Sequence, residues 1–279
     1  APLGHCLEVF KYHSVGHSGE PPVLSLIHDL QVPEQEVCIV QHAGQHILFD
    51  LYPKPMRIYL DQLGCRLNFS ENDTLAGQLT AAGHQVVAGP EEAQVIVLNT
   101  CAVTHIAAQK TRQALRRLHR ENPGARLVAT GCYAELTPGD LRNLPGVGLV
   151  VGNQGKERLE ELLGNGEAIG GATGFAQRPA SSLPRSRTRA LVKIQDGCDN
   201  ACTYCIIHVA RGPQRSRPPD EVLAEVRARL AAGHQEIVLT GVHLGSWGRD
   251  FSHLQVLASL VKPIFREADT PRLRLSSLE

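Results

Sequence analysis

The sequence has few aromatic residues and no long apolar run. Phe, Trp and Tyr make up 4% of its 279 residues, and no apolar run approaches the roughly 20 residues that a membrane helix needs. The first residues show no basic segment followed by an apolar core, so we expect no signal peptide. These absences favour a soluble globular protein that binds no membrane and acts in the cytoplasm.

Net charge is also lacking, because 28 Lys and Arg balance 28 Asp and Glu. The balance is uneven along the chain: residues 1–55 carry two Lys or Arg against six Asp or Glu, which leaves a mildly basic remainder. Cysteine is present eight times. Without a secretory signal, clustered thiols indicate a reducing compartment, where they hold metal or do redox chemistry more often than they form disulfides.

Strands and helices alternate from Met56 onward. We expect strands at 57–63, 94–100, 125–131 and 146–152, and helices at 70–83, 105–124 and 137–144. This order predicts an α/β domain, residues 56–163, with a parallel sheet and right-handed crossovers. Residues 164–189 are rich in Gly, Pro, Ser and Arg without periodicity, and are expected to be a linker.

The alternation restarts after the linker, in a second domain at residues 190–279. We expect strands at 190–196, 236–241 and 272–279, and helices at 219–233 and 252–268. A last strand with an open edge is a liability that folds avoid, so we expect this domain to be incomplete. Residues 1–55 differ in character: they hold six of the 13 histidines. We expect a hairpin around Gly44, free thiols at Cys6 and Cys38, and no part in the functional fold.

Three cysteines follow strands of the first domain directly. They are Cys65, Cys101 and Cys132. The carboxyl ends of parallel strands meet at one edge of a sheet, so the pattern predicts a shared metal site rather than three ordinary buried cysteines. Three thiolates suit an iron–sulfur cluster with one open iron. His105 keeps a Cys3His zinc site as an alternative.

A second set of three cysteines lies within "GCDNACTYC", with the spacing C-x3-C-x2-C: Cys198, Cys202 and Cys205. Three such thiolates can hold three corners of a cubane cluster and leave the fourth iron open to a substrate. A zinc site completed by His208 is the alternative. The loop follows a strand and precedes a crossover helix, where α/β barrels bind cofactors, and this position favours the cluster.

The second cysteine set, with Tyr204 before its last cysteine, resembles the signature of the radical S-adenosylmethionine (SAM) enzymes. In that superfamily the open iron takes the amino and carboxylate groups of SAM. "LGCRLNFSE", "VLNTCAVT" and "ATGCYAE" resemble the amino-terminal domain of methylthiotransferases, in which three cysteines hold an auxiliary [4Fe–4S] cluster. "VKIQDGCDNACTYCII", "ARGPQRSRP", "LTGVHLGSWGRD" and "LRLSSLE" resemble the branch that acts on tRNA N6-threonylcarbamoyladenosine.

The resemblance covers about residues 56–279 and implies a fold and a set of sites. The fold is a Rossmann- or flavodoxin-like parallel sheet domain followed by the first part of a radical SAM partial (β/α) barrel. The radical-generating cluster would be held by Cys198, Cys202 and Cys205, and the auxiliary cluster by Cys65, Cys101 and Cys132. SAM would lie near Tyr204, Thr240 and Gly241. The chain has His208-Val209 where the family usually has Pro-Tyr.

The implied reaction adds a methylthio group to C2 of N6-threonylcarbamoyladenosine at position 37 of tRNA. The implied partners are tRNA and an electron donor such as a flavodoxin or ferredoxin, with the protein acting as a monomer. Two alternatives stay open. One is the same chemistry on isopentenyladenosine in tRNA or on a ribosomal protein aspartate. The other is an iron–sulfur or zinc binding module that truncation has left without catalysis.

Basic residues lie near both cysteine sets and are candidates for RNA phosphate contacts. One group follows Cys101 on a predicted helix: Lys110, Arg112, Arg116, Arg117 and Arg120. The other brackets the second cysteine set: Arg185, Arg187, Arg189, Arg211, Arg215 and Arg217. A solvated helix face and a basic linker are the alternative interpretation.

Overall fold

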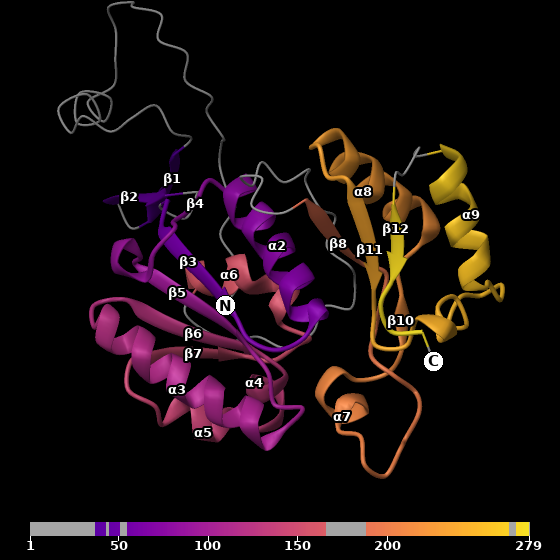
Figure 1. The fold of residues 1–279 in the computed structure, drawn as a ribbon. Coiled ribbons are helices and arrows are strands. Elements are labelled where there is room, and N and C mark those ends of the chain that lie inside the picture. Colours follow the sequence, from indigo (N-terminus) through magenta and orange to yellow (C-terminus); the bar gives the residue numbers. More distant parts are fainter. Residues whose placement is uncertain (1–36, 43–44, 51–54, 166–187, 268–271, 279) are drawn as a thin grey trace, which may run out of the picture. The chain divides into compact units, whose positions relative to one another are not determined.

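The computed structural model describes residues 37–42, 45–50, 55–165, 188–267 and 272–278 (Figure 1). The chain divides into two compact units, residues 1–54 and 55–279. In the first, β1 (Val37–His42) and β2 (Gln45–Asp50) pair antiparallel, as the sequence predicted. Gly44, the thiols of Cys6 and Cys38, and most of the predicted linker lie outside the described part. None of the described helices combines the length and apolar content that crossing a bilayer requires.

A five-stranded parallel sheet forms the first part of the second unit, which confirms the predicted α/β alternation. The spatial order is β4-β3-β5-β6-β7, and every neighbouring pair is parallel. The strands are β3 (Arg57–Gln62), β4 (Gln85–Val86), β5 (Val95–Thr100), β6 (Arg126–Gly131) and β7 (Val147–Val151). The sequence did not predict β4, because two residues are too few to show a period.

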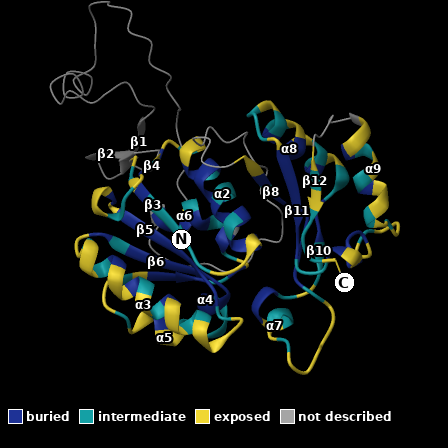
Figure 2. Ribbon diagram, viewed as in Figure 1, coloured by how far each residue is buried: buried dark blue, intermediate teal, exposed yellow. Residues whose placement is uncertain are grey.

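Helices cover both faces of this sheet, so its central strands are apolar on both sides. On β5, Ile96 and Leu98 pack in the same core as Leu115 of α3 (His105–Glu121). Val95 and Val97 point to the opposite face, into the core that holds Leu75 and Leu79 of α2 (Arg66–Ala81). The shorter helices are α4 (Cys132–Leu136), α5 (Pro138–Arg142) and α6 (Leu159–Asn165), with single turns η1 (Pro90–Glu92) and η2 (Lys156–Arg158). Figure 2 shows β5 and β6 mostly dark, as buried strands, and the outer face of α3 exposed.

Helix α2 begins earlier than the sequence predicted. We expected a helix over 70–83, but it starts at Arg66, with Cys65 as its N-cap residue. Asn68, Ser70 and Glu71 in its first turns are buried rather than solvated. Their hydrogen bonds to distant parts of the chain hold this polar segment in helical form. From sequence alone, such residues are instead interpreted as the N-terminal cap of a solvated helix.

A second, three-stranded parallel sheet has the order β12-β11-β8. Its strands are β8 (Arg189–Lys193), β11 (Glu236–Thr240) and β12 (Leu273–Leu275). Helices α8 (Pro219–Ala231) and α9 (Leu257–Glu267) share a core with it, in which Val222 and Leu260 pack with Trp247 and Ile237. Parallel strands alternate with helices here, as the sequence predicted for residues 190–279.

Three predicted boundaries in this second part were wrong. The last strand, expected at 272–279, ends at Leu275. The strand expected at 190–196 is interrupted at Ile194, and β9 (Gln195–Asp196) pairs antiparallel with β10 (Arg215–Ser216). Helix α9 starts at Leu257 rather than 252, because the segment before it turns back so that Gln255 N donates to Gly248 O at 3.1 Å. The remaining turns are α7 (Ile207–Arg211) and η3 (Leu244–Ser246).

Helix α2 also contacts the second sheet. It packs on β3 and β5 through one face and on β8 and β11 through another. The hydroxyl of Ser70 donates to the carbonyl of Leu191 at 3.0 Å. Polar residues early in α2 therefore lie between the two sheets, close to the carboxyl ends of strands from the first.

Candidate functional site

The first cysteine set lies at the carboxyl edge of the five-stranded sheet. Cys65 follows β3 and precedes α2, Cys101 follows β5 directly, and Cys132 follows β6 directly. Strands β3, β5 and β6 are neighbours in the sheet. Cys65 is exposed, whereas Cys101 and Cys132 are 6% and 2% exposed. Three cysteines far apart in sequence thus share one edge.

A glycine before Cys65 brings two of these segments into contact. Gly64 has a φ of 104°, which other residues rarely adopt. A Cβ at this position would lie 2.6 Å from Cys101 Cβ and 2.7 Å from Cys101 Sγ. Only glycine lets the β3 loop pass this close to the Cys101 side chain.

The Asn68 side chain ties the ends of β3 and β5 together beside the cysteines. Its Nδ2 donates to Leu63 O at 2.6 Å and to Thr100 O at 3.1 Å. Its Oδ1 lies 3.9 Å from Cys65 Sγ and accepts from Arg211 Nη2 at 2.8 Å. Asn68 is buried, and its bonds to Thr100 and Arg211 are buried as well. One amide therefore fixes the two strand ends and joins them to a residue near the second cysteine set.

Burial and neighbouring groups change the pKa of one of these thiols, Cys101. Burial raises the pKa of Cys101, and the neighbouring Cys132 and Cys65 add to this effect, while the backbone amide of Val103 and the Arg211 guanidinium oppose it. A thiol with a raised pKa becomes a thiolate when a cation takes the place of its proton. Three sulfur donors at one sheet edge fit an iron–sulfur cluster better than they fit a hard cation.

Neither the cluster assignments nor the zinc alternatives correspond to a preformed metal site in the described part of the chain. Among the described residues, no three His, Cys, Asp or Glu side chains form a group that could hold a metal ion. His105 is an exposed residue at the start of α3. His208 lies in α7, and its Nδ1 is buried without a hydrogen-bond partner. Assignment of the six cysteines as ligands stays a prediction from their positions and donor chemistry.

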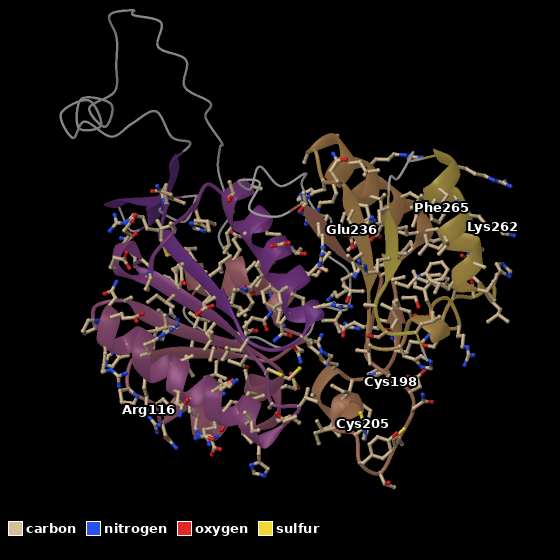
Figure 3. All side chains as sticks on the ribbon, viewed as in Figure 1. Arg116, Cys198, Cys205, Glu236, Lys262 and Phe265 are labelled. Carbon is tan, nitrogen blue, oxygen red and sulfur yellow. The ribbon has the colours of Figure 1, made fainter. Side chains whose placement is uncertain are left out.

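The second cysteine set lies on the loop between β9 and α7 (Figure 3). Gly197 turns the chain with a φ of 67°, and a Cβ there would collide with the Pro213 carbonyl. Cys198 N donates to Gly212 O at 3.1 Å, and Cys205 N donates to Cys202 O at 3.0 Å. The loop is closed at its base and exposed at its tip, where Cys202 lies.

Gln195 joins this loop to the end of β11 and was missed from the sequence. Its Nε2 donates to Gly197 O at 2.7 Å, and its Oε1 accepts from Val242 N at 2.8 Å and His243 N at 2.9 Å. The loop and the carboxyl end of β11 are therefore held together by one buried side chain. No local sequence pattern predicts such a bridge, because Val242 and His243 are 47 and 48 residues away from Gln195.

The predicted SAM contacts differ in exposure. Tyr204 is 91% exposed at the loop. Thr240 is buried at the end of β11, and its Oγ1 lies 3.2 Å from the hydroxyl of Ser276. Gly241 packs against Leu244 and Gln195 with no space for a side chain. Their contact with SAM stays a prediction.

The expected RNA contacts of two arginines need correction. Arg211 and Arg217 are 2% and 5% exposed and form internal ion pairs, so neither presents its guanidinium to an external phosphate. Sequence proximity to the loop did not reveal that carboxylates pack against them. Arg215 is partly exposed, 4.0 Å from Asp196, and Arg189 pairs with Glu236. Arg185 and Arg187 lie outside the described residues.

The predicted basic residues of α3 are more accessible. Lys110, Arg116 and Arg120 are exposed, and Figure 3 labels Arg116 on this helix. Arg117 lies 3.4 Å from Asp61 and 3.7 Å from Glu121. Arg112 donates to the hydroxyl of Tyr133 at 2.6 Å. Contact of these residues with RNA stays a prediction.

A buried ionic network lies between the two cysteine sets. Its centre is Glu71 on α2. Glu71 Oε1 pairs with Arg211 at 2.8 Å and Lys193 at 3.3 Å. Glu71 Oε2 pairs with Lys156 at 2.6 Å and accepts from Asn99 at 3.2 Å. Each carboxylate oxygen thus has two donors, which fills its acceptor capacity.

Asp196 is the second carboxylate of this network. It lies 2.9 Å from Arg211 and 3.1 Å from Lys193. Burial alone would raise the pKa of both carboxyl groups, but the neighbouring cations outweigh it. The pKa of Glu71 is well below its ordinary value, and that of Asp196 is also lowered. Both carboxylates are therefore ionised at neutral pH.

Comparison with known proteins assigns the two parts of the unit. Residues 57–152 match the family described as "Uncharacterized protein family UPF0004", and residues 192–263 match the "Radical SAM superfamily". The solved structure of the radical SAM methyltransferase TsrM from Kitasatospora setae, with cobalamin and a [4Fe–4S] cluster bound, has a similar fold. The TM-score is 0.54 at 16% identity, over 79% of this chain and 55% of that one.

Curated relatives are more similar in sequence. The threonylcarbamoyladenosine tRNA methylthiotransferase MtaB of Bacillus subtilis is 37% identical over 78% of this chain and 50% of the relative. The tRNA-2-methylthio-N(6)-dimethylallyladenosine synthase of Bacillus pumilus is 33% identical over 79% and 46%. The chain spans about half the length of these relatives.

Fold and matches together define a radical SAM protein in which a UPF0004 domain precedes the radical SAM domain. The chain belongs to the radical SAM methylthiotransferase family, and over its matched part it is similar to the MtaB proteins.

Proposed function

We propose that the chain acts in radical SAM methylthiolation of tRNA, adding a methylthio group to C2 of N6-threonylcarbamoyladenosine at position 37. One observation carries the proposal. Two sets of three cysteines lie at the carboxyl ends of strands, and buried polar side chains from α2 and α7 join them. The similarity to MtaB supports the choice of nucleoside.

Each cysteine set would hold one [4Fe–4S] cluster: Cys198, Cys202 and Cys205 the radical-generating one, and Cys65, Cys101 and Cys132 the auxiliary one. When bound, the clusters and SAM supply a 5′-deoxyadenosyl radical, sulfur and a methyl group. The protein's own groups bind, orient and exclude side reactions. Tyr204, Thr240 and Gly241 would contact SAM at the loop and the end of β11. We further propose a monomer that is reduced by a flavodoxin or ferredoxin.

The exposed cations of α3 would contact the RNA backbone. Lys110, Arg116 and Arg120 lie on the helix that follows Cys101, so phosphates held there would approach the auxiliary cysteines. Such contacts give affinity without reading sequence. Choice of the modified base would have to come from side chains near the two cysteine sets.

Nucleoside analysis of tRNA tests the proposal. Cells that lack the gene should lose 2-methylthio-N6-threonylcarbamoyladenosine and accumulate the form without the methylthio group. The gene should restore the modification, whereas its Cys198→Ala variant should not. An unchanged level of the methylthio nucleoside would refute the proposal.

The same chemistry on isopentenyladenosine is a second candidate, supported by the Bacillus pumilus relative. Loss of the methylthio form of isopentenyladenosine, with the threonylcarbamoyl nucleoside unaffected, would favour it. Loss of neither nucleoside would direct the search to a ribosomal protein aspartate.

A further inference from the structure

The buried network carries more positive than negative charge. Three cations, Lys156, Lys193 and Arg211, face two carboxylates, Glu71 and Asp196, and no side chain among them is more than 15% exposed. Burial lowers the pKa of Lys156 and Glu71 opposes this shift. The Nζ of Lys156 donates to three acceptors, Glu71 Oε2 at 2.6 Å, Asn153 Oδ1 at 3.0 Å and Asn99 Oδ1 at 3.1 Å, and only the ammonium form has three donors. A buried surplus charge is costly unless an opposite charge lies near it.

The surplus lies beside the first cysteine set. Asn68 Oδ1 accepts from Arg211 Nη2 at 2.8 Å and lies 3.9 Å from Cys65 Sγ. One amide oxygen thus separates the guanidinium from that thiol. Electrostatic interaction with Cys132 also helps to raise the pKa of Arg211, although burial opposes it.

The side-chain amide of Asn153 also connects α7 to the first cysteine set. Asn153 Nδ2 donates to Ala210 O at 2.5 Å and lies 3.7 Å from Cys132 Sγ. Ala210 and Arg211 end α7, the short helix that follows the C-x3-C-x2-C loop. The end of one cysteine loop is therefore bonded, through two asparagines, to cysteines of the other set.

We propose that Arg211 is a positioning residue for the auxiliary site: its charge raises the reduction potential of the cluster held by Cys65, Cys101 and Cys132, and its ion pairs hold the radical loop against that site. The inference rests on the proposed function. Reduction adds one electron to the cluster, and a buried cation interacts with the added charge more strongly than a solvent-exposed cation would, because the effective dielectric constant is lower. Arg211 belongs to the radical SAM part of the chain, so packing of that part against the first sheet affects the reduction potential of the auxiliary cluster.

The test isolates the auxiliary site. In the Cys198→Ala/Cys202→Ala/Cys205→Ala chain, reconstituted anaerobically, only that site can load iron. Dithionite is the reductant that is oxidised as the cluster takes up its electron, and paramagnetic resonance follows the titration. Three further changes are compared in this background: Arg211→Gln, Glu71→Gln and Arg217→Gln. Arg217 is the matched control, because it is also buried, at 5% exposed, and pairs with Glu225 at 2.6 Å; it contacts the network through the Lys193 backbone oxygen at 2.9 Å.

Arg211→Gln should lower the potential by about 59 mV or more, equivalent to a tenfold change in a one-electron equilibrium constant. Glu71→Gln should raise the potential, because it removes a negative charge from the same network. Arg217→Gln should leave it unchanged. Loss of stability alone would not move two variants in opposite directions.

Equal potentials in all variants would overturn the inference and leave the proposed function intact. If the Arg211→Gln chain loads no iron, the Glu71→Gln variant tests the inference instead. An unchanged reduction potential in that variant overturns the inference. Failure of the parent triple-alanine chain to load iron would refute the auxiliary site itself and, with it, both proposals.

Discussion

Replacement of Glu71 by Gln removes one buried charge and almost no volume. The carboxylate accepts from Arg211, Lys193, Lys156 and Asn99. Gln keeps one acceptor oxygen but places an amide NH2 against cationic donors. Arg211 and Lys193 then share Asp196, and Lys156 keeps only the amide oxygens of Asn99 and Asn153 beside the new Gln.

The magnitude follows from burial. Removing one partner of a buried ion pair costs about 3–5 kcal/mol, because the charge left behind is desolvated without compensation. Gln retains some hydrogen bonding, so we expect the lower end, about 3 kcal/mol. For a unit of this size, each kcal/mol lowers the unfolding temperature by roughly 2–4 °C, which predicts a fall of about 6–12 °C.

Thermal unfolding followed by far-ultraviolet circular dichroism measures this change, with Glu236→Gln as the matched control. The Glu236 side chain is also only 8% exposed and lies 2.8, 3.2 and 3.9 Å from three arginines, but the arginine side chains are 45–68% exposed. The Glu71→Gln change strands buried cations, whereas here the arginines left behind can be solvated and solvent screens their ion pairs, so this variant should lose about 0–1 kcal/mol and unfold within a few degrees of wild type. Equal effects of the two changes would refute the argument that burial makes the Glu71 network important.

Three further predictions follow from the same contacts. Because the pKa values of Glu71 and Asp196 are lowered on folding from ordinary values of 4.5 and 3.8, their stabilisation is full above these values and is lost as pH falls through the lower folded-state values. The unfolding temperature of wild type should therefore drop below about pH 4, and that of Glu71→Gln should drop less. Gly64→Ala should lose auxiliary iron, whereas Gly83→Ala, at a φ of 87° with nothing within 4 Å, should cost about 1 kcal/mol and keep its iron; equal iron in both would show that the approach to the cysteine is not needed. Arg116→Gln should reduce the slope of log affinity for tRNA against log salt by about 0.7–0.9, and an unchanged slope would remove this residue from the RNA contact surface.

Most strands and the cysteine edge could be predicted from sequence, because both depend on local patterns. Apolar runs such as 95–100 are flanked by helical periods, and the rule that parallel strands share a carboxyl edge then brings Cys65, Cys101 and Cys132 together. Neither inference needs to know which distant residues touch.

The ionic network could not be predicted for the opposite reason. Glu71 and Arg211 are 140 residues apart, and Asn68 and Arg211 are 143 apart. In sequence, the polar start of α2 is typical of a solvated cap, and a basic residue near a cysteine loop is typical of an RNA contact. Only the packing of α2 against α7 and β8 reveals that these charges neutralise one another.

Iron and acid-labile sulfide per chain, measured with zinc after anaerobic reconstitution, test the central claim most directly. Wild type should hold about eight irons, and the Cys198→Ala/Cys202→Ala/Cys205→Ala and Cys65→Ala/Cys101→Ala/Cys132→Ala variants about four each, as two separate clusters require. Zinc without sulfide in wild type, or iron that neither triple variant changes, would contradict the assignment of two cluster sites.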